Sequence, residues 1–201
     1  MNTKQIIALS MPIILLVTIY PIFQALSQKF GNQKGWFLGL VVYWILWGGI
    51  FSFVIMGKDT VARLVHPQTI ELQAVLLTAV PIVFSLIGRV FMGVNYEKSS
   101  GWVLLVLLAT AVANGVFEEL LWRGIYLELF PGSLLFQIIW PSLWFGLWHY
   151  APGSVSNSEN VWGLVSSAVV FGLFLSLLAR QTDTLWWPIL GHTLAGIIMV
   201  I

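Results

Sequence analysis

The sequence lacks cysteine and carries very little charge. None of its 201 residues is a cysteine, which rules out disulfides, thiolate metal sites and a cysteine nucleophile. Charged residues make up 8% of the chain, against roughly 25% in an ordinary soluble domain. The formal net charge is only +1, so the chain has no basic face of the kind that binds nucleic acid.

Hydrophobic side chains take the place of the missing charge. They account for 59% of the residues, including 11 tryptophans, and the mean hydropathy is +0.92. A soluble domain of this size has no room to bury so much apolar surface. The composition therefore indicates an integral membrane protein, and we expect a multi-pass protein of the plasma (inner) membrane with the lipid bilayer as its main partner.

Polar breaks divide the chain into apolar runs, several of them near the roughly 20 residues that a spanning helix needs. We expect an all-α fold, a polytopic transmembrane helix bundle that forms one membrane domain over residues 1–201. The predicted helical segments number about seven: 6–26, 36–56, 70–92, 102–130, 134–150, 161–179 and 186–201.

We interpret the first run as a retained helix, because it is longer than the apolar core of a signal peptide and further spans follow it. If the spans alternate, one side of the membrane receives slightly more basic residues than the other. That excess favours a cytoplasmic N-terminus. The two groups are Lys4, Lys58, Arg63 and Arg180, against Lys29, Lys34 and Lys98.

An acidic pair, Glu118 and Glu119, interrupts the fourth run, and Arg123 follows it. A charge at bilayer depth costs roughly 2.5–3.5 kcal/mol even on the lenient insertion scale, so such residues usually serve a function. Glu119 and Arg123 are four residues apart and share a helix face, which predicts an ion pair. Glu118 lies about 100° away round the helix and is left to face a cavity. A simple ion pair that packs helices is the alternative reading.

Two histidines follow in later segments. Phe145 and His149 are four residues apart and share a face, where an imidazole can hold a water or ligate a metal. His192 is expected about one turn inside the last span, after Pro188 in its first turn. Alone, each is better explained by a structural role, His149 at the membrane interface and His192 in helix packing. His66 lies in a polar loop and is expected to be solvated.

Taken together, these residues indicate a particular protein family far more specifically than any one of them does. Their order resembles that of the CPBP family, also called Abi, which groups CAAX-type prenyl-protein endopeptidases with bacteriocin-processing and immunity proteins. The resemblance implies the architecture of the Rce1-like intramembrane proteases, with a catalytic core at about 102–201. The residues that carry it are Glu118, Glu119 and Arg123 in a first motif, Phe145 and His149 in a second, and His192 at the start of a third.

The resemblance also implies a function for each motif. The chain would be a glutamate-type intramembrane endopeptidase that cuts a membrane-associated protein or peptide without a metal or other cofactor. Glu118 and His149 would activate a water, and His192 would help to stabilise the oxyanion. Glu119 and Arg123 would hold the site together, with Phe145 in support.

The third motif departs from the family pattern. Four residues after His192, where the family has Asn or Asp, the chain has Gly196, which has no side chain to donate. One oxyanion donor is commonly worth about 3 to 4 kcal/mol of barrier. Asn114 and Thr193 are the nearest polar candidates to replace it. A non-catalytic immunity or peptide-binding protein is therefore one alternative, and a zinc-dependent protease that uses a glutamate and the two histidines is another.

Depth in the membrane sets a further requirement. Simple alternating spans would place Glu118 and His192 near one surface and His149 near the other. A short or broken helix between residues 131 and 150 would bring the three together, and Pro141 provides a place for a kink.

Overall fold

Helices make up nearly all of the computed structural model, which describes residues 1–67, 69–92, 101–156 and 160–200. Within these ranges no strand occurs, which confirms the prediction of an all-α polytopic bundle. In chain order the elements are α1 (Thr3–Phe30), α2 (Asn32–Tyr43), the π-helical η1 (Trp44–Phe51), α3 (Ser52–Met56), α4 (Lys58–Val65), α5 (Leu72–Met92), α6 (Gly101–Glu119), the π-helical η2 (Leu120–Gly124), α7 (Ile125–Leu129), the π-helical η3 (Leu135–Ile139), α8 (Trp140–Trp148), α9 (Tyr150–Gly153), α10 (Val161–Thr182) and α11 (Trp186–Val200).

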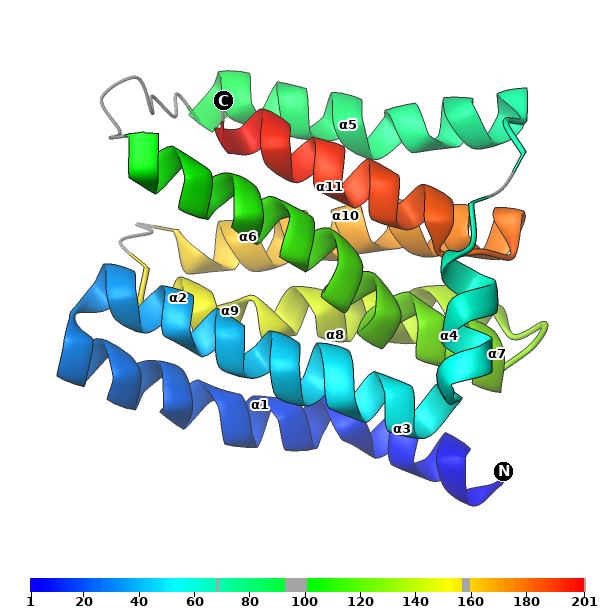
Figure 1. Ribbon diagram of the computed structural model, residues 1–201, viewed down its shortest axis with the longest axis horizontal. Coiled ribbons are helices and arrows are strands. Elements are labelled where there is room, and N and C mark those ends of the chain that lie inside the picture. Colours follow the sequence, from blue (N-terminus) through cyan, green and yellow to red (C-terminus); the bar gives the residue numbers. More distant parts are fainter. Residues whose placement is uncertain (68, 93–100, 157–159, 201) are drawn as a thin grey trace.

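The long helices run side by side between two ends of the molecule (Figure 1). Among the described residues, five helical stretches are long and apolar enough to cross a membrane: Thr3–Phe30, Asn32–Met56, Leu72–Val90, Gly101–Leu129 and Val161–Thr182. Helix α11 is apolar but shorter, with 15 residues. The chain is an integral membrane protein, as the composition predicts.

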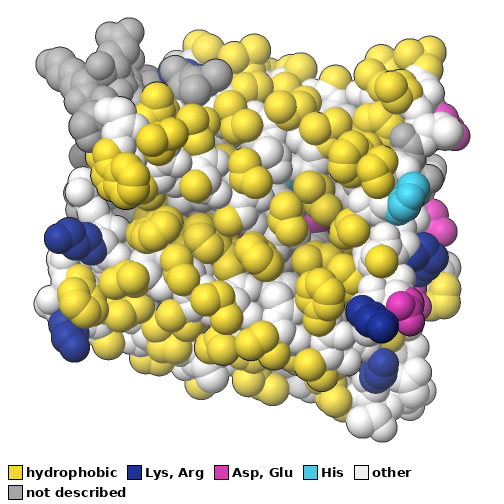
Figure 2. All heavy atoms as spheres, viewed as in Figure 1, with side chains coloured by type: hydrophobic (Ala, Val, Ile, Leu, Met, Phe, Trp, Pro, Cys, Tyr) yellow, Lys and Arg dark blue, Asp and Glu magenta, His cyan; other side chains and the backbone are white. Residues whose placement is uncertain are grey.

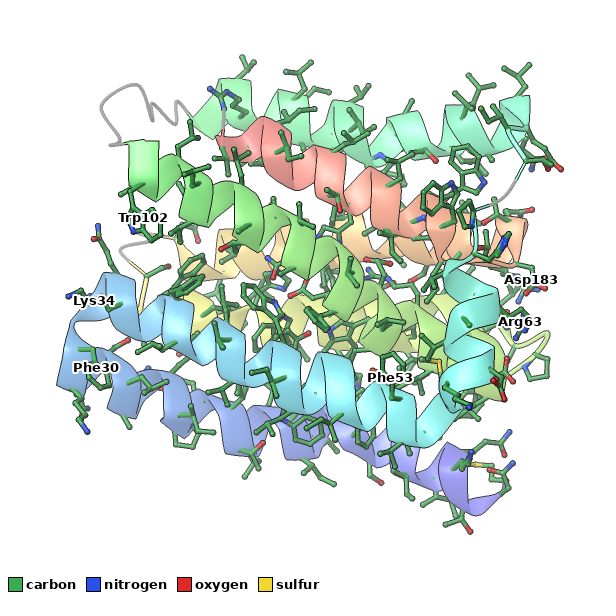
Figure 3. All side chains as sticks on the ribbon, viewed as in Figure 1. Phe30, Lys34, Phe53, Arg63, Trp102 and Asp183 are labelled. Atoms are coloured by element: carbon green, nitrogen blue, oxygen red, sulfur yellow. The ribbon has the colours of Figure 1, made fainter. Side chains whose placement is uncertain are left out.

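Polar and apolar side chains separate along the helix direction. Basic side chains gather toward both ends and acidic side chains toward one of them, and hydrophobic side chains cover the face between the ends (Figure 2). Phe30, Lys34 and Trp102 lie at one end, while Arg63 and Asp183 lie at the other (Figure 3). The exposed hydrophobic side chains between the ends form the surface that meets lipid.

The breaks between helices are shorter than the sequence indicates. Helix α1 continues to Phe30, and Gly31 alone separates it from α2, with a φ of 80° that favours glycine. Gly57 makes a similar turn at φ 85°, and the chain then forms the short helix α4 where the sequence predicts only a loop. Most of the predicted break at 95–101 lies outside the described residues.

The predicted segment 134–150 changes helix type along its length but is continuously helical from Leu134 to Trp148. It begins with the π-helical η3 and changes to α-helix at Trp140, with Pro141 in the first turn of α8. After His149 the chain continues into α9 rather than ending at a membrane surface. The rings of His149 and His192 both contact that of Phe145, at 4.7 Å and 6.0 Å, so the two histidines lie near each other in the bundle.

Candidate active site

The two glutamates end α6 in the interior of the bundle. Glu118 is 1% exposed and Glu119 is fully buried. The π-helical η2 follows at once and carries Arg123. Wide turns of this type are frequent at functional sites, because they change the direction of side chains within a continuous helix.

Glu119 is hydrogen-bonded to side chains of η2 and α11. Its Oε1 accepts a hydrogen bond of 2.9 Å from Nη1 of Arg123 and one of 2.7 Å from Nδ1 of His192. All three side chains are buried. The predicted ion pair is therefore present, and it also fixes the imidazole of α11.

Arg123 is held on several sides. Its Nε donates to Oγ of Ser176 at 3.3 Å and its Nη2 to the carbonyl of Gly172 at 3.3 Å, both on α10. The guanidinium lies 4.3 Å from the centre of the Phe145 ring, a cation–π contact. A Cβ at Gly172 would lie 3.2 Å from Nη2 of Arg123, so the close approach of α10 depends on this glycine.

Glu118 has a different environment, as its position round the helix predicts. Its Oε1 accepts a 3.2 Å hydrogen bond from Nε1 of Trp148 on α8. Its Oε2 lies 3.6 Å from Nε2 of His192 and has no hydrogen-bond partner within the described part of the chain. A buried carboxylate oxygen without a partner costs free energy, so it marks a place where a water or a substrate group is expected.

His149 lies at the edge of this cluster. Its Nδ1 is 2.7 Å from the backbone oxygen of Phe145. A carbonyl oxygen can only accept, so Nδ1 carries the proton and the neutral ring presents a lone pair on Nε2. Its ring is 4.7 Å from that of Phe145, which is itself 6.0 Å from that of His192. Across the described ranges, no hydrogen bond joins His149 to Glu118.

The imidazole of His192 lies between the two glutamates. It donates from Nδ1 to Glu119, and its Nε2 lies 3.6 Å from Oε2 of Glu118. Two carboxylates and one guanidinium are thus gathered in the interior, where an uncompensated charge costs several kcal/mol.

Gly196 has a packing explanation. A Cβ at this position would lie 3.0 Å from Cβ of Ala111 on α6, closer than ordinary van der Waals contact.

The two hydrogen-bond donors that the sequence offers in place of a side chain at Gly196 are both near α6. Asn114 accepts a 2.8 Å hydrogen bond at Oδ1 from Nε1 of Trp44, which leaves its NH₂ group to donate. The Thr193 hydroxyl packs against Gly115, where a Cβ would lie 2.1 Å from Oγ1.

Several residues that surround the site are not identified by the sequence analysis. Trp148 is the direct donor to Glu118, and Tyr43 stacks on its indole. Ser142 contacts Ser176 at 3.2 Å behind the guanidinium of Arg123. Trp148 has one signal, its position beside His149, whereas nothing local marks Tyr43.

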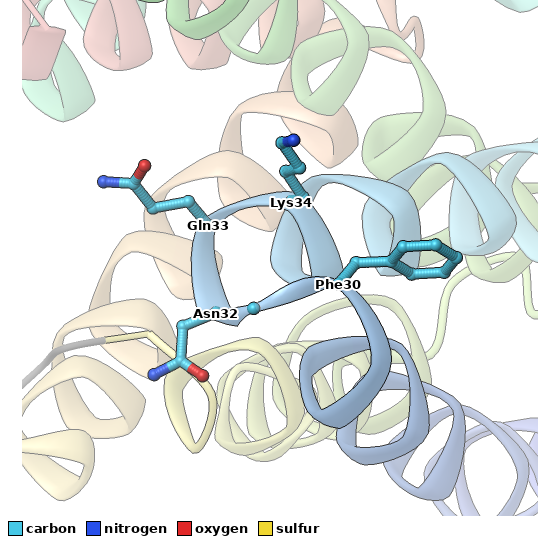
Figure 4. A pocket seen from close by; sticks show the side chains of 5 residues that line it. Phe30, Asn32, Gln33 and Lys34 are labelled. Carbon is cyan, nitrogen blue, oxygen red and sulfur yellow. The ribbon is translucent and has the colours of Figure 1, made fainter.

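The remaining candidates lie elsewhere. His66 is exposed, with Nδ1 2.8 Å from the Pro67 carbonyl. A shallow hollow at the turn between α1 and α2, lined by Phe30 to Lys34, contains none of the predicted site residues (Figure 4). Within the described residues, no group of three His, Cys, Asp or Glu side chains is arranged to hold a metal ion.

Comparison with known protein families gives a match over the C-terminal half of the chain. Residues 100–198 fit the family model described as type II CAAX prenyl endopeptidase Rce1-like. No curated protein and no solved structure matches the chain.

Proposed function

The chain belongs to the Rce1-like family of CAAX-type intramembrane proteases, and from this premise we propose that it hydrolyses a peptide bond of a membrane-associated protein or peptide with a water activated by Glu118. The observation that carries the proposal is the approach of the buried Oε2 of Glu118 to Nε2 of His192, at 3.6 Å. This oxygen has no hydrogen-bond partner among the described residues, which is also true of Oε2 of Glu119.

In the proposed reaction, Glu118 takes a proton from the water as the water oxygen bonds to the peptide carbonyl carbon. The lone pair on Nε2 of His149 accepts a hydrogen bond from the same water and orients it. The carbonyl oxygen becomes an oxyanion, to which His192 donates from a protonated Nε2. Glu118 then returns its proton to the leaving nitrogen as the C–N bond breaks.

Glu119 and Arg123 support this sequence of steps. The hydrogen bond from Nδ1 of His192 to Glu119 stabilises the imidazolium and sets the direction of Nε2. Arg123 in turn holds Glu119 and contacts Phe145, the residue whose carbonyl orients His149. Both histidines are thus tied to one guanidinium.

The test is cleavage of a farnesylated peptide with a C-terminal CAAX sequence by the purified protein in liposomes. Glu118→Gln keeps the size of the side chain and removes the base, so the rate should fall by roughly 10²–10⁴-fold. Glu128→Gln is the matched control, because Glu128 pairs with Arg63 at the surface and should leave the rate unchanged. An unprenylated peptide with the same sequence reports whether the lipid is recognised.

Two outcomes would contradict the proposal. If Glu118→Gln cleaves at the wild-type rate, Glu118 is not the base. If cleavage is lost after exhaustive chelation and restored by zinc, the reaction is that of a zinc protease. The melting temperature of each variant, measured in detergent, shows whether it still folds.

A further inference from the structure

Trp148 controls which oxygen of Glu118 is available. The indole Nε1–H can only donate, and it donates to Oε1 at 3.2 Å. Trp148 and Glu118 are each 1% exposed, so water does not compete for this bond. The same bond leaves Oε2 as the oxygen near His192.

Two aromatic rings from the N-terminal half of the chain contact the indole of Trp148. The ring of Tyr43 on α2 stacks on it, with centroids 3.8 Å apart and planes at 19°. The ring of Phe23 on α1 contacts it at 5.9 Å. These two rings limit the directions in which Nε1 can point.

Tyr43 is itself fixed. It is fully buried, and its hydroxyl accepts a 2.9 Å hydrogen bond from Nε1 of Trp122. Trp122 belongs to η2, the segment that follows the two glutamates. The aromatic contacts therefore run from η2 to α2, from α2 to α8, and from α8 back to Glu118.

We propose that Trp148 positions Glu118 and that Tyr43 positions the indole of Trp148. Tyr43 and Phe23 lie outside residues 100–198, so the α1–α2 hairpin forms a working part of the active site rather than only a membrane anchor. The inference rests on the proposed role of Glu118 as the base.

The kinetic test uses three substitutions and the farnesylated CAAX peptide. Trp148→Phe keeps an aromatic ring but removes the N–H, and kcat should fall about 10- to 100-fold, the usual range for a lost hydrogen bond to a charged group. KM should stay within about twofold, because no substrate contact is removed. Trp144→Phe, on the same helix, is the control and should keep the wild-type kcat.

Tyr43 is tested through its dependence on Trp148. Tyr43→Leu removes the stacked ring and should lower kcat as Trp148→Phe does, whereas Tyr43→Phe keeps the ring and should restore kcat to within about threefold of wild type. If Tyr43 acts through Trp148, Tyr43→Leu adds no further loss in a Trp148→Phe background. Losses that multiply, or an unchanged kcat in Trp148→Phe, would overturn the proposal.

A second measurement does not depend on turnover. The indole N–H resonance of Trp148, identified by its absence in Trp148→Phe, should shift in Glu118→Ala and stay in place in Glu128→Gln. If that resonance shifts as expected but the wild type cleaves no peptide, the proposed function fails while the contact stands. If cleavage depends on Glu118 and the resonance does not shift, the positioning role alone is wrong.

Discussion

Glu118 and Glu119 are neighbours in the chain but share no hydrogen-bond donor. Oε1 of Glu119 accepts from Arg123 and His192, and Oε1 of Glu118 accepts from the indole of Trp148. Among the described residues, Oε2 of each carboxylate has no hydrogen-bond partner. The difference follows from the rotation of about 100° per residue in a helix, which turns adjacent side chains toward different neighbours. One carboxylate is thereby suited to hold a histidine, and the other to exchange a proton.

The missing side chain at Gly196 leads to a prediction at Asn114. Oδ1 of Asn114 is occupied by Trp44, so its NH₂ group is the one free to donate, four residues before Glu118 on the same face of α6. We expect Asn114→Ala to lower kcat by about 10²–10³-fold, the usual cost of one oxyanion donor. Cleavage of the farnesylated peptide measures the loss.

Thr193→Val is the comparison for this prediction. It removes the hydroxyl that packs against Gly115 but keeps the shape of the side chain. A large loss in Thr193→Val together with normal activity in Asn114→Ala would assign the second donor to Thr193 instead.

At the scale of the elements, the crossing of α6 and α11 brings His192 to the glutamates. The two helices approach closely where Gly115 faces Thr193 and where Gly196 faces Ala111. Small residues at such contacts let the backbones of membrane helices come together. The sequence departs from the family at Gly196 in a place where this packing leaves little room for a side chain.

Gly115→Ala should disrupt this crossing. Its new Cβ would lie 2.1 Å from Oγ1 of Thr193, and overpacking typically costs about 1–3 kcal/mol. We expect a lower melting temperature and a lower cleavage rate, because His192 moves with α11. Gly88→Ala is the control: it adds the same methyl group to α5, where nothing lies within 4 Å. If Gly115→Ala and the wild type had equal melting temperatures, α6 and α11 would have to accommodate the added methyl group without loss of stability.

Contacts within one helix were predictable from the sequence, and contacts between helices were not. The 3.6-residue period is enough to pair Glu119 with Arg123. The bond from Trp148 to Glu118 depends on how α6 packs against α8, and the contribution of Tyr43 on how α2 lies beside both. Helix α4 was missed because Gly57 and two charged residues after it are typical of a loop.

At the scale of the whole molecule, the two ends of the bundle carry different charged side chains. The N-terminus, Arg63 and Asp183 lie at one end, and Lys34 lies at the other (Figures 1 and 3). The predicted cytoplasmic N-terminus would place the end with Arg63 in the cytoplasm. The candidate site lies in the interior of the bundle, where Glu118, Glu119 and Arg123 are buried.

The absence of cysteine makes this orientation testable. Lys34→Cys and Gln181→Cys each introduce a single exposed thiol, one at each end. A membrane-impermeant maleimide added to intact cells should label Lys34→Cys at once and Gln181→Cys only after permeabilisation. The opposite pattern would place the N-terminus outside.

The contact between His192 and Glu119 spans 73 residues of sequence, and this separation has a consequence for biogenesis. At about 5–20 residues per second, a ribosome needs roughly 4–15 seconds to proceed from α6 to α11. During that interval Arg123 can already pair with Glu119, because both lie in one continuous stretch of helix. Glu118 meets its neighbours Trp148 and His192 only after α8 and α11 have been made.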